Sequence, residues 1–466
     1  MRYISTRGAS PALPFEDVML SGLAPDGGLY MPEVWPQIGA DEMAALATRT
    51  YPEAALQVLK RFTGPGVPLP DLYTAIQHAY ASFPGGRVAP LRDMGDGLHL
   101  MELFHGPTFA FKDVALQLLG RLMDWGLKRS GKRALIVGAT SGDTGSAAIA
   151  GLRGLTAVDV VILHPKGKTS DVQRRQMTTV LDENVRNLAV EGNFDDCQAI
   201  VKALFSDHEL SAHLNLAAVN SINWARIAAQ IVYYITAAAA LGAPAREIDF
   251  AVPTGNFGDI FAGYAAQRMG AFKGRLIVAT NENDILKRCI DTGAYEPRAV
   301  VETTSPSMDI QVSSNFERLV FEAADRDGAA VASLMDDLKT KGSFTLGGNI
   351  RSAISDRFDA ERVTAAEAAA EIAAVAGAGG RVVLDPHSAI GLVAARRRQR
   401  AGVPMVALAT AHAAKFAEAV NAATGNPPEM PESLAKLASL PERYETVPAE
   451  TSAIRAYIEA FAARPR

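Results

Sequence analysis

The fold class is indicated most directly by the segment ALIVGATSGDTGSAAIA, residues 134–150. Its first four residues are an apolar run typical of a buried strand, and residues 146–150 are typical of a helix. The turn between them is rich in glycine, which lets the backbone approach a ligand, and the N-terminus of the following helix favours an anion. The segment therefore predicts a strand, an anion-binding turn and a helix, the repeating unit of α/β folds. For this segment alone, the alternative is an ordinary strand-to-helix turn.

Two standard phosphate-binding motifs do not match this turn. The dinucleotide-binding fingerprint requires glycine at position 140, where the chain has Thr140. A P-loop requires lysine after Gly145, where the chain has Ser146, and the Gly-Lys-Thr sequence at 167–169 has Ile162 in place of the first P-loop glycine. The turn is therefore an anion site of another kind, and its three hydroxyls belong to Thr140, Ser141 and Thr144.

A second glycine-rich turn, PTGNFGD at residues 253–259, has the same surroundings. It follows the short apolar run 250–252 and precedes IFAGY, residues 260–264, which is typical of a helix. Successive backbone N–H groups in such a turn form a concave anion site. The chain thus has two predicted anion sites, each with an ordinary turn as its alternative.

Lys112 is the candidate nucleophile, at the end of HGPTFAFKD, residues 105–113. It follows an apolar run in a segment that Gly106 and Pro107 open, so we expect its amine to be partly removed from water, which favours the neutral form. A neutral lysine amine forms a Schiff base with a carbonyl. A surface lysine at a helix start is the alternative. Together with two anion sites, Lys112 suggests a site for a phosphorylated cofactor and an anionic substrate.

At these three motifs the chain resembles the threonine synthase family, and in particular its longer bacterial and fungal form. The resemblance extends nearly from end to end, and its motifs occur in the family's order. The further matching segments are LAPDGGLYMP at 23–32, NSINWAR at 220–226, SMDI at 307–310 and ATAH at 409–412. One departure is Ala413, where the family usually has proline.

The resemblance implies an α/β fold of mostly parallel sheets covered by helices. This is the pyridoxal phosphate (PLP) fold type II of the tryptophan synthase beta-like family, with a cleft between a large and a small domain and an additional N-terminal region. We expect the N-terminal region at residues 1–95 and the PLP-dependent catalytic region at 96–466, with a small α/β subdomain at roughly 113–220. Length agrees, since 466 residues exceed one compact core.

The resemblance also implies the cofactor contacts. Lys112 would hold PLP and act as the mobile base, and Thr410 would face the pyridine nitrogen, where a hydroxyl leaves the ring a weaker electron sink than a carboxylate would. Asp143 stands where related lyases usually carry asparagine near the 3′-oxygen, and its role stays open. The cofactor phosphate would be bound by the second turn, at Thr254, Gly255, Asn256, Phe257 and Gly258.

The implied substrate is O-phospho-L-homoserine. Its carboxylate would lie on the first turn, at Thr140, Ser141 and Thr144. Arg226, with Asn220 and Ser221 just before it, would bind the substrate phosphate, because guanidinium binds phosphate with two-pronged geometry. The alternative for Arg226 is a surface arginine on an exposed helix face. The implied reaction is γ-elimination of phosphate followed by β-addition of water to give L-threonine.

Three other functions stay open. Another PLP-dependent lyase, either a serine or threonine dehydratase or a phospho-lyase giving 2-oxobutanoate, would share Lys112 and the second turn but would not need Arg226. A nicotinamide-dependent oxidoreductase is disfavoured by Thr140. A non-catalytic PLP-binding or interaction protein is disfavoured because every expected reactive residue is present.

Composition excludes several other classes. Net charge is −5 without a basic run, which argues against nucleic acid. Cys197 and Cys289 provide neither a disulfide framework nor a metal-binding spacing, so we expect two buried thiols, no metal and a reducing cytoplasm. Residues 1–8 lack the apolar stretch of a signal peptide, and the most apolar helix, 231–241, is too short for a bilayer. A monomer or a homodimer fits equally.

Strands and helices alternate beyond residue 95. Helices are expected at 114–127, 195–205, 224–241 and 365–376. Strands are expected at 158–163, 216–219, 276–279, 382–384 and 405–409. In such folds ligands lie beyond the carboxyl ends of the strands, which is where both turns and Thr410 fall.

Overall fold

The computed structural model describes residues 1–140, 142–378 and 382–464, and these form two compact units. The larger unit combines residues 1–76, 83–105 and 221–429. The smaller unit combines residues 77–82, 106–220 and the described residues from 430 onward. The chain therefore leaves the larger unit after residue 105 and returns to it at residue 221, and its C-terminal segment joins the smaller unit again.

The larger unit is built on a six-stranded sheet, and five of its strands run parallel. Only the edge strand β4 is antiparallel to its neighbour β5. The strand order is β14 (Phe358–Arg362), β11 (Leu276–Thr280), β10 (Asp249–Pro253), β15 (Met405–Ala409), β5 (Leu98–Glu102) and β4 (Leu91–Gly95). The central strands are apolar on both faces, as parallel strands covered by helices require.

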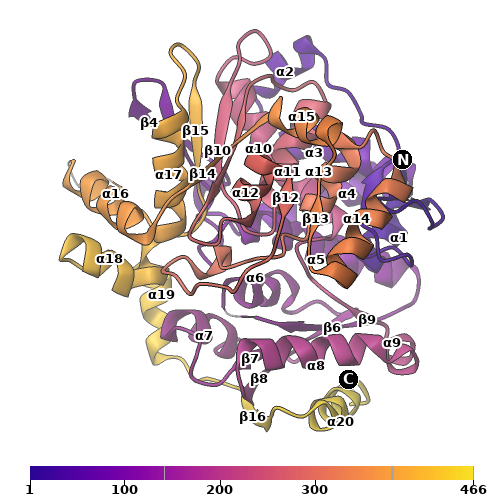
Figure 1. Cartoon of the computed structure of the whole chain (residues 1–466). Helices are drawn as coiled ribbons and strands as arrows, with labels where there is room; N and C mark the ends of the chain where they lie inside the picture. Colours follow the sequence, from indigo (N-terminus) through magenta and orange to yellow (C-terminus); the bar gives the residue numbers. More distant parts are fainter. Residues whose placement is uncertain (141, 379–381, 465–466) are drawn as a thin grey trace. The chain divides into compact units, whose positions relative to one another are not determined.

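Helices cover both faces of this sheet (Figure 1). One face packs under α17 (Pro386–Arg398), where a Cβ on Gly391 would lie 2.9 Å from Pro253, with α16 (Ala365–Gly377) against α17. The other face packs under α11 (Gly258–Arg268) and α10 (Trp224–Ala240), where the Tyr234 ring meets Phe250 edge-on at 5.0 Å. α17 can approach its strand this closely because Gly391 has no side chain.

The N-terminal region of the larger unit packs on α10. Its small antiparallel sheet has the order β2 (Leu13–Pro14), β1 (Arg2–Ser5) and β3 (Tyr30–Pro32). Its helices are α1 (Phe15–Ser21), α2 (Ala40–Leu46), α3 (Tyr51–Thr63) and most of α4 (Leu69–Tyr80), whose last residues, from 77 on, belong to the smaller unit. Trp224, the first residue of α10, is the centre of the contact. Its fully buried ring lies 5.7–6.0 Å from three others, those of Tyr3, Trp35 and Phe62.

The remaining elements of the larger unit follow β11 in the chain. They are α12 (Ile285–Thr292), β12 (Ala294–Tyr295), α13 (Phe316–Ala323), α14 (Gly328–Lys341), β13 (Phe344–Thr345), α15 (Gly348–Ser355) and α18 (Ala417–Thr424). β12 and β13 pair with each other in antiparallel orientation.

The smaller unit contains a five-stranded, fully parallel sheet. Its order is β16 (Glu445–Pro448), β8 (Val185–Glu191), β7 (Val158–Pro165), β6 (Ala134–Ala139) and β9 (Leu216–Ala217). On one face lie α5 (Lys112–Arg129) and α6 (Asp143–Leu152), which cross so closely that a Cβ on Gly120 would lie 2.2 Å from the Gly151 carbonyl oxygen. The other helices are α7 (Asp171–Thr178), α8 (Phe194–Ser206), α9 (His208–Leu214), α19 (Glu432–Lys436) and α20 (Thr451–Ala462).

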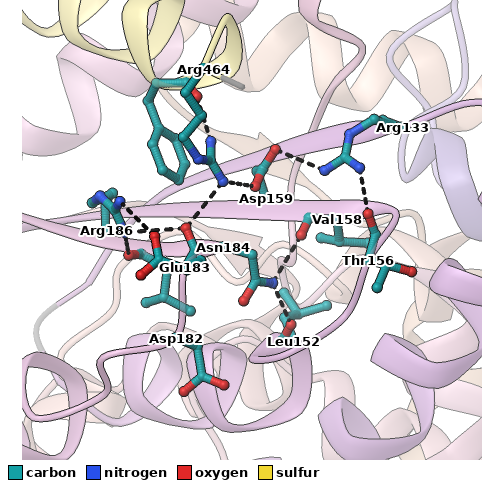
Figure 2. Close-up of polar contacts among 12 residues, drawn as sticks. Arg133, Leu152, Thr156, Val158, Asp159, Asp182, Glu183, Asn184, Arg186 and Arg464 are labelled. Carbon is teal, nitrogen blue, oxygen red and sulfur yellow. Dashed lines mark hydrogen bonds and ion pairs between the residues drawn. The ribbon is translucent and has the colours of Figure 1, made fainter. Parts of the chain in front are cut away.

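The end of the chain is fastened to the smaller unit at the start of its strands. Figure 2 shows Asp159, on β7, between Arg464, which donates to it at 2.7 Å, and Arg133, which donates at 3.2 Å. The amide of Asn184 donates to the carbonyls of Leu152 and Val158, both at 2.9 Å. These bonds fix α20 and the loops at this edge of the sheet.

The structure confirms the mostly parallel sheets covered by helices, and most expected elements lie within a few residues of their predicted bounds. The strand expected at 382–384 is wrong. Leu384 forms only an isolated bridge with His412. The chain instead enters α17, because the Asp385 side chain caps that helix and Pro386 is its first residue.

Two further observations concern the described residues. Cys197 and Cys289 are free and buried, as expected. None of the helices there is both long enough and apolar enough to cross a membrane.

Candidate active site

The candidate site residues fall into two groups, one in each unit. Lys112, Asp143 and the turn after β6 belong to the smaller unit, as does Asn220. Ser221, Arg226, Thr410 and the turn after β10 belong to the larger unit. Ser141 lies outside the described residues.

Lys112 is the first residue of α5, and only 7% of its surface is exposed. The turn before it is held by Asp113, whose carboxylate accepts from the Thr108 backbone N–H at 2.8 Å and from the Thr108 hydroxyl at 2.7 Å. Phe109 adopts the left-handed conformation, with φ +60°, inside this turn. The Lys112 amine, Nζ, lies 3.7 Å from Oδ2 of Asp143. The amine is thus enclosed beside a carboxylate, and the surface-lysine alternative does not hold.

The turn after β6 is closed by a side chain of its own. The Thr140 hydroxyl oxygen accepts from the N–H of Gly142 at 3.0 Å and from that of Gly145 at 2.9 Å. Gly142 has φ +148°, and a Cβ there would lie 2.5 Å from the Gln173 amide. Thr140 is buried and Thr144 is half-buried. Thr140 therefore shapes the turn through its oxygen.

The side chain of Asp143, whose role the sequence leaves open, contacts Lys112 and Gln173. Its Oδ2 faces Lys112, and its Oδ1 accepts from the Gln173 amide at 2.9 Å. The sequence carried no signal for Gln173, since a glutamine early in a polar helix is unremarkable.

The turn after β10 presents unused backbone donors. In the described part of the chain, the backbone N–H groups of Gly255, Asn256, Phe257 and Gly258 have no hydrogen-bond acceptor. Phe257 is buried and has φ +62°, a left-handed conformation that points successive N–H groups to one side. Thr254 closes the strand by donating its hydroxyl to the Val252 carbonyl at 2.6 Å. The turn is therefore an open anion site at the N-terminus of α11.

A neighbouring segment, residues 313–315, supports this turn from behind. The Ser313 hydroxyl donates to the Gly255 carbonyl at 2.6 Å, and the Asn315 amide donates to the Asn256 carbonyl at 2.9 Å. A Cβ on Gly255 would lie 2.8 Å from the Ser307 carbonyl oxygen. The carbonyls of the turn are thus bound to protein while its N–H groups stay available. No motif in the sequence indicated this support.

Thr410 follows β15 directly and is held by a buried polar chain. Its N–H donates to the Ser388 hydroxyl at 2.9 Å, and Ser388 in turn donates to Asp385. His387 Nδ1 lies 2.7 Å from the same carboxylate, and His387 Nε2 accepts from the Ser307 N–H at 3.2 Å, which assigns the ring proton to Nδ1. The Asp-Pro step at 385–386 is the sequence signal for this cap.

Arg226 is buried on α10, with 4% of its surface exposed, so the exposed-helix alternative is wrong. Its guanidinium forms no hydrogen bond or ion pair within the described ranges. Burial lowers its pKa to about 10, against the opposing charges of Tyr233 and Asp259. Of the residues before it, Ser221 lies 3.3 Å, oxygen to oxygen, from Ser314, whereas Oδ1 of the Asn220 side chain is buried and has no hydrogen-bond partner among the described residues.

Asp259, in the first turn of α11, is a buried acidic residue whose charge acts on Arg226. Burial raises the pKa of Asp259 to about 6, although hydrogen bonds from Tyr233 and Tyr234 and the charge of Arg226 favour its ionised form. The hydroxyl of Tyr234 donates at 2.9 Å. This cluster was not predicted, because its members are spread over two helices.

These residues fit PLP. An enclosed lysine amine can hold the aldehyde, and unused backbone N–H groups at a helix N-terminus can hold the phosphate. No group of three or more histidine, cysteine or acidic side chains in the described ranges is arranged to bind a metal ion.

Fold and site together define a PLP-dependent enzyme, and the comparisons agree: the family model "Pyridoxal-phosphate dependent enzyme" matches residues 88–337. The models "Threonine synthase N terminus" and "Threonine synthase, C-terminal" match residues 2–80 and 388–458. The chain belongs to the threonine synthase family.

Relatives and solved structures support this membership. The chain is 50% identical to a threonine synthase of Pseudomonas aeruginosa, covering 98% of both chains, and 41% identical to that of Saccharomyces cerevisiae, covering 96% and 95%. It superposes on a PLP-bound threonine synthase from Brucella melitensis with a TM-score of 0.97 at 52% identity, covering all of both chains. The yeast threonine synthase structure gives a TM-score of 0.94 at 40% identity, covering 99% of both.

Proposed function

We propose that the protein converts O-phospho-L-homoserine and water to L-threonine and phosphate, the last step of threonine biosynthesis. Family membership supports the reaction, and the observation that carries it is the enclosed Lys112 amine 3.7 Å from Asp143. A base that removes protons from carbon needs such a place, because water would otherwise compete for it.

Bound PLP supplies an electron sink, which makes the α- and β-protons of an attached amino acid removable. Lys112 Nζ takes the α-proton and then a β-proton, and phosphate leaves from the γ-carbon. The γ-carbon then takes up a proton, water adds its oxygen at the β-carbon, and a proton returns to the α-carbon to give L-threonine. The free N–H groups of Gly255, Asn256, Phe257 and Gly258 bind the cofactor phosphate, and Thr254 holds the start of their turn. Thr410 would hold the pyridine nitrogen without contributing a full charge.

The substrate groups use other residues. Thr140, Ser141 and Thr144 orient the substrate carboxylate. Arg226 binds the substrate phosphate, with Asn220 and Ser221 beside it in the chain. A buried guanidinium without a hydrogen-bond partner supports this role, because a dianionic phosphate would supply the missing acceptors.

The first test concerns Lys112. Borohydride treatment of the PLP-loaded protein should fix the cofactor to Lys112, identified by peptide mass spectrometry. Lys112→Ala should lose both the visible absorption of the bound cofactor and turnover, because no other amine replaces it. An adduct on another lysine would overturn the assignment.

The second test concerns Arg226. Arg226→Ala should retain PLP but lose roughly 30- to 1000-fold in kcat/KM for O-phosphohomoserine, since a charge-assisted phosphate contact contributes about 2–4 kcal/mol. Arg226→Lys should recover only part, because it keeps the charge without the two-pronged geometry. Loss of PLP in Arg226→Ala would instead assign the residue to the cofactor, and unchanged phosphate release would remove it from the site.

Another PLP-dependent lyase, which would release 2-oxobutanoate, shares Lys112 and the cofactor turn. A keto-acid assay run beside threonine and phosphate assays separates the two activities. We also propose a cytoplasmic location and a monomeric or homodimeric state. The two separate buried thiols support a reducing compartment.

A further inference from the structure

Two glutamines on one face of α7 form hydrogen bonds with residues next to Lys112. Gln173 donates its amide to Asp143 Oδ1 at 2.9 Å, and Asp143 Oδ2 faces the Lys112 amine. One helical turn later, Gln176 donates its amide to the Thr108 carbonyl at 3.0 Å, in the turn that precedes Lys112. A shift of α7 would therefore move the hydrogen-bond donors that hold Asp143 and the turn before Lys112.

Another face of α7 is bound by Glu442, from the C-terminal segment. Arg174 donates to the Glu442 carboxylate through Nε at 2.9 Å and through Nη2 at 3.1 Å, and the Thr178 hydroxyl donates to it at 2.6 Å. This two-pronged pair with a third donor holds the pKa of Glu442 at about 2, first through the Arg174 hydrogen bonds. Residues 174 and 178 are one turn apart on the helix, so one carboxylate fixes both the position and the rotation of α7.

The C-terminal segment is itself anchored, so Glu442 is a fixed point. The Arg443 N–H donates to the Thr178 carbonyl at 2.7 Å, and its guanidinium donates to the carbonyls of Asp182 and Val185. Two residues later β16 begins, and it pairs in parallel with β8. Figure 1 shows this yellow segment running past α7 to the edge of the sheet.

We propose that Glu442 is a positioning residue for Lys112: through Arg174 and Thr178 it sets α7, and through Gln173 it sets the Asp143 carboxylate beside the lysine amine. The proposal rests on the role of Lys112 in the proposed function. Attraction between two charges varies inversely with their separation, so the placement of Asp143 decides how strongly it favours the protonated amine. Asp113, the other acidic group next to Lys112, accepts hydrogen bonds from the N–H and the hydroxyl of Thr108.

The test measures the proton affinity of Lys112 in cofactor-free, full-length protein, from the pH dependence of its acetylation rate by peptide mass spectrometry. Glu442→Gln keeps the shape of the side chain but removes its charge. We expect the proton affinity of Lys112 to fall by about threefold or more, which is about half a pKa unit. The pH midpoint of the visible absorption of the PLP-loaded enzyme should shift as well.

A matched control is available three residues later in the same segment. Glu445 accepts a hydrogen bond from Tyr457 at 2.7 Å, and none of its hydrogen bonds reaches α7. Glu445→Gln should leave both midpoints unchanged. An equal shift in this control would mean that the effect is a general loss of charge near the C-terminus, and the proposal would fail.

A double-mutant cycle tests the path through Gln173. Gln173→Leu should shift the Lys112 midpoint by itself, and adding Glu442→Gln should then change it no further. Additive shifts, or no shift in Glu442→Gln, would overturn the proposal. If Glu442→Gln does not fold, Thr178→Val replaces it in the same cycle, since it removes one hydrogen bond and keeps the shape.

The two proposals fail differently. Lys112 acetylation is measured without cofactor, so it reports on Glu442 even if borohydride places PLP on another lysine. In that case the positioning effect would stand while the proposed function failed. If borohydride fixed PLP to Lys112 but the Lys112 midpoint stayed unchanged in both Glu442→Gln and Gln173→Leu, only the positioning role would be rejected.

Discussion

Asp259 illustrates how burial changes a single side chain. Its carboxyl group is removed from water, and its Oδ2 has no hydrogen-bond partner within the described residues. The desolvation cost outweighs the hydrogen bonds from two tyrosines and the nearby charge of Arg226, and the pKa rises to about 6. A residue that looks like an ordinary acidic helix start is therefore a group that titrates close to neutral pH.

This raised pKa predicts a pH dependence of stability. Below about pH 4 the carboxyl is protonated in both the folded and the unfolded state. Between about pH 4 and pH 6 it ionises in the unfolded chain but not in the folded protein. The free energy of unfolding therefore falls as the pH rises through this range. Replacing Asp259 by asparagine should remove this decline. The difference between wild-type and Asp259→Asn stability should change by about 3 kcal/mol over this range, measured by urea unfolding at each pH. If the free energies of unfolding of the two proteins differed by the same amount at every pH, the raised pKa of Asp259 would be contradicted.

The two glycines in the turn between β10 and α11 leave different amounts of room for a side chain. Gly255 is packed against the Ser307 carbonyl, where a Cβ would lie at 2.8 Å. At Gly258 the nearest atom to a Cβ is the Asn315 amide nitrogen at 3.3 Å, a contact that a small movement relieves. The same turn thus tolerates change unequally at its two glycines.

We therefore expect Gly255→Ala to weaken PLP binding more than Gly258→Ala, because only the former pushes the turn away from its backbone support. PLP affinity is measured by titrating cofactor-free protein and following its visible absorption. Gly348→Ala, where a Cβ would meet nothing within 4 Å, is the control and should bind PLP normally. A larger loss of PLP affinity in Gly258→Ala than in Gly255→Ala would contradict this prediction. It would mean that contact with the cofactor phosphate, and not packing against Ser307, restricts side chains in the turn.

The division of the chain into two units makes the C-terminal segment part of a core that begins much earlier in the sequence, at β6 and β7. On one face of the smaller sheet, Ile454, Ile458 and Phe461 of α20 join the side chains of β6, β7, β8 and α8. Such a cluster makes α20 a structural member of the sheet and not a loose tail.

Truncating a side chain in this cluster should destabilise one unit selectively. Ile458 is fully buried, and Ile458→Ala should cost about 2–5 kcal/mol. Hydrogen exchange should show faster exchange in β8 and α8, with little change in β10. Ile372→Ala, in the core of the larger sheet, should show the opposite pattern. Equal loss of protection in both units by either variant would mean that the units unfold as one.

The sequence by itself determined the alternating pattern, both glycine-rich turns and the isolated Lys112. These are local properties: a parallel strand covered on both faces has to be apolar, and a turn that approaches an anion has to be glycine-rich. The error at 382–384 is of the same local kind. Three apolar residues cannot form a strand where Asp385 and Pro386 already start a helix, and the capping residues outweigh the apolar run.

Only the tertiary structure decided the contacts between distant residues. Gln173 meets Asp143 across 30 positions, Glu442 meets Arg174 across 268, and Asp259 meets two tyrosines on another helix. Single polar side chains at such separations leave no periodic pattern in the sequence, because their partners are chosen by the packing of the sheet and helices. Local sequence therefore specifies which chemical groups the site contains, while tertiary packing specifies what each group touches and how burial changes its charge.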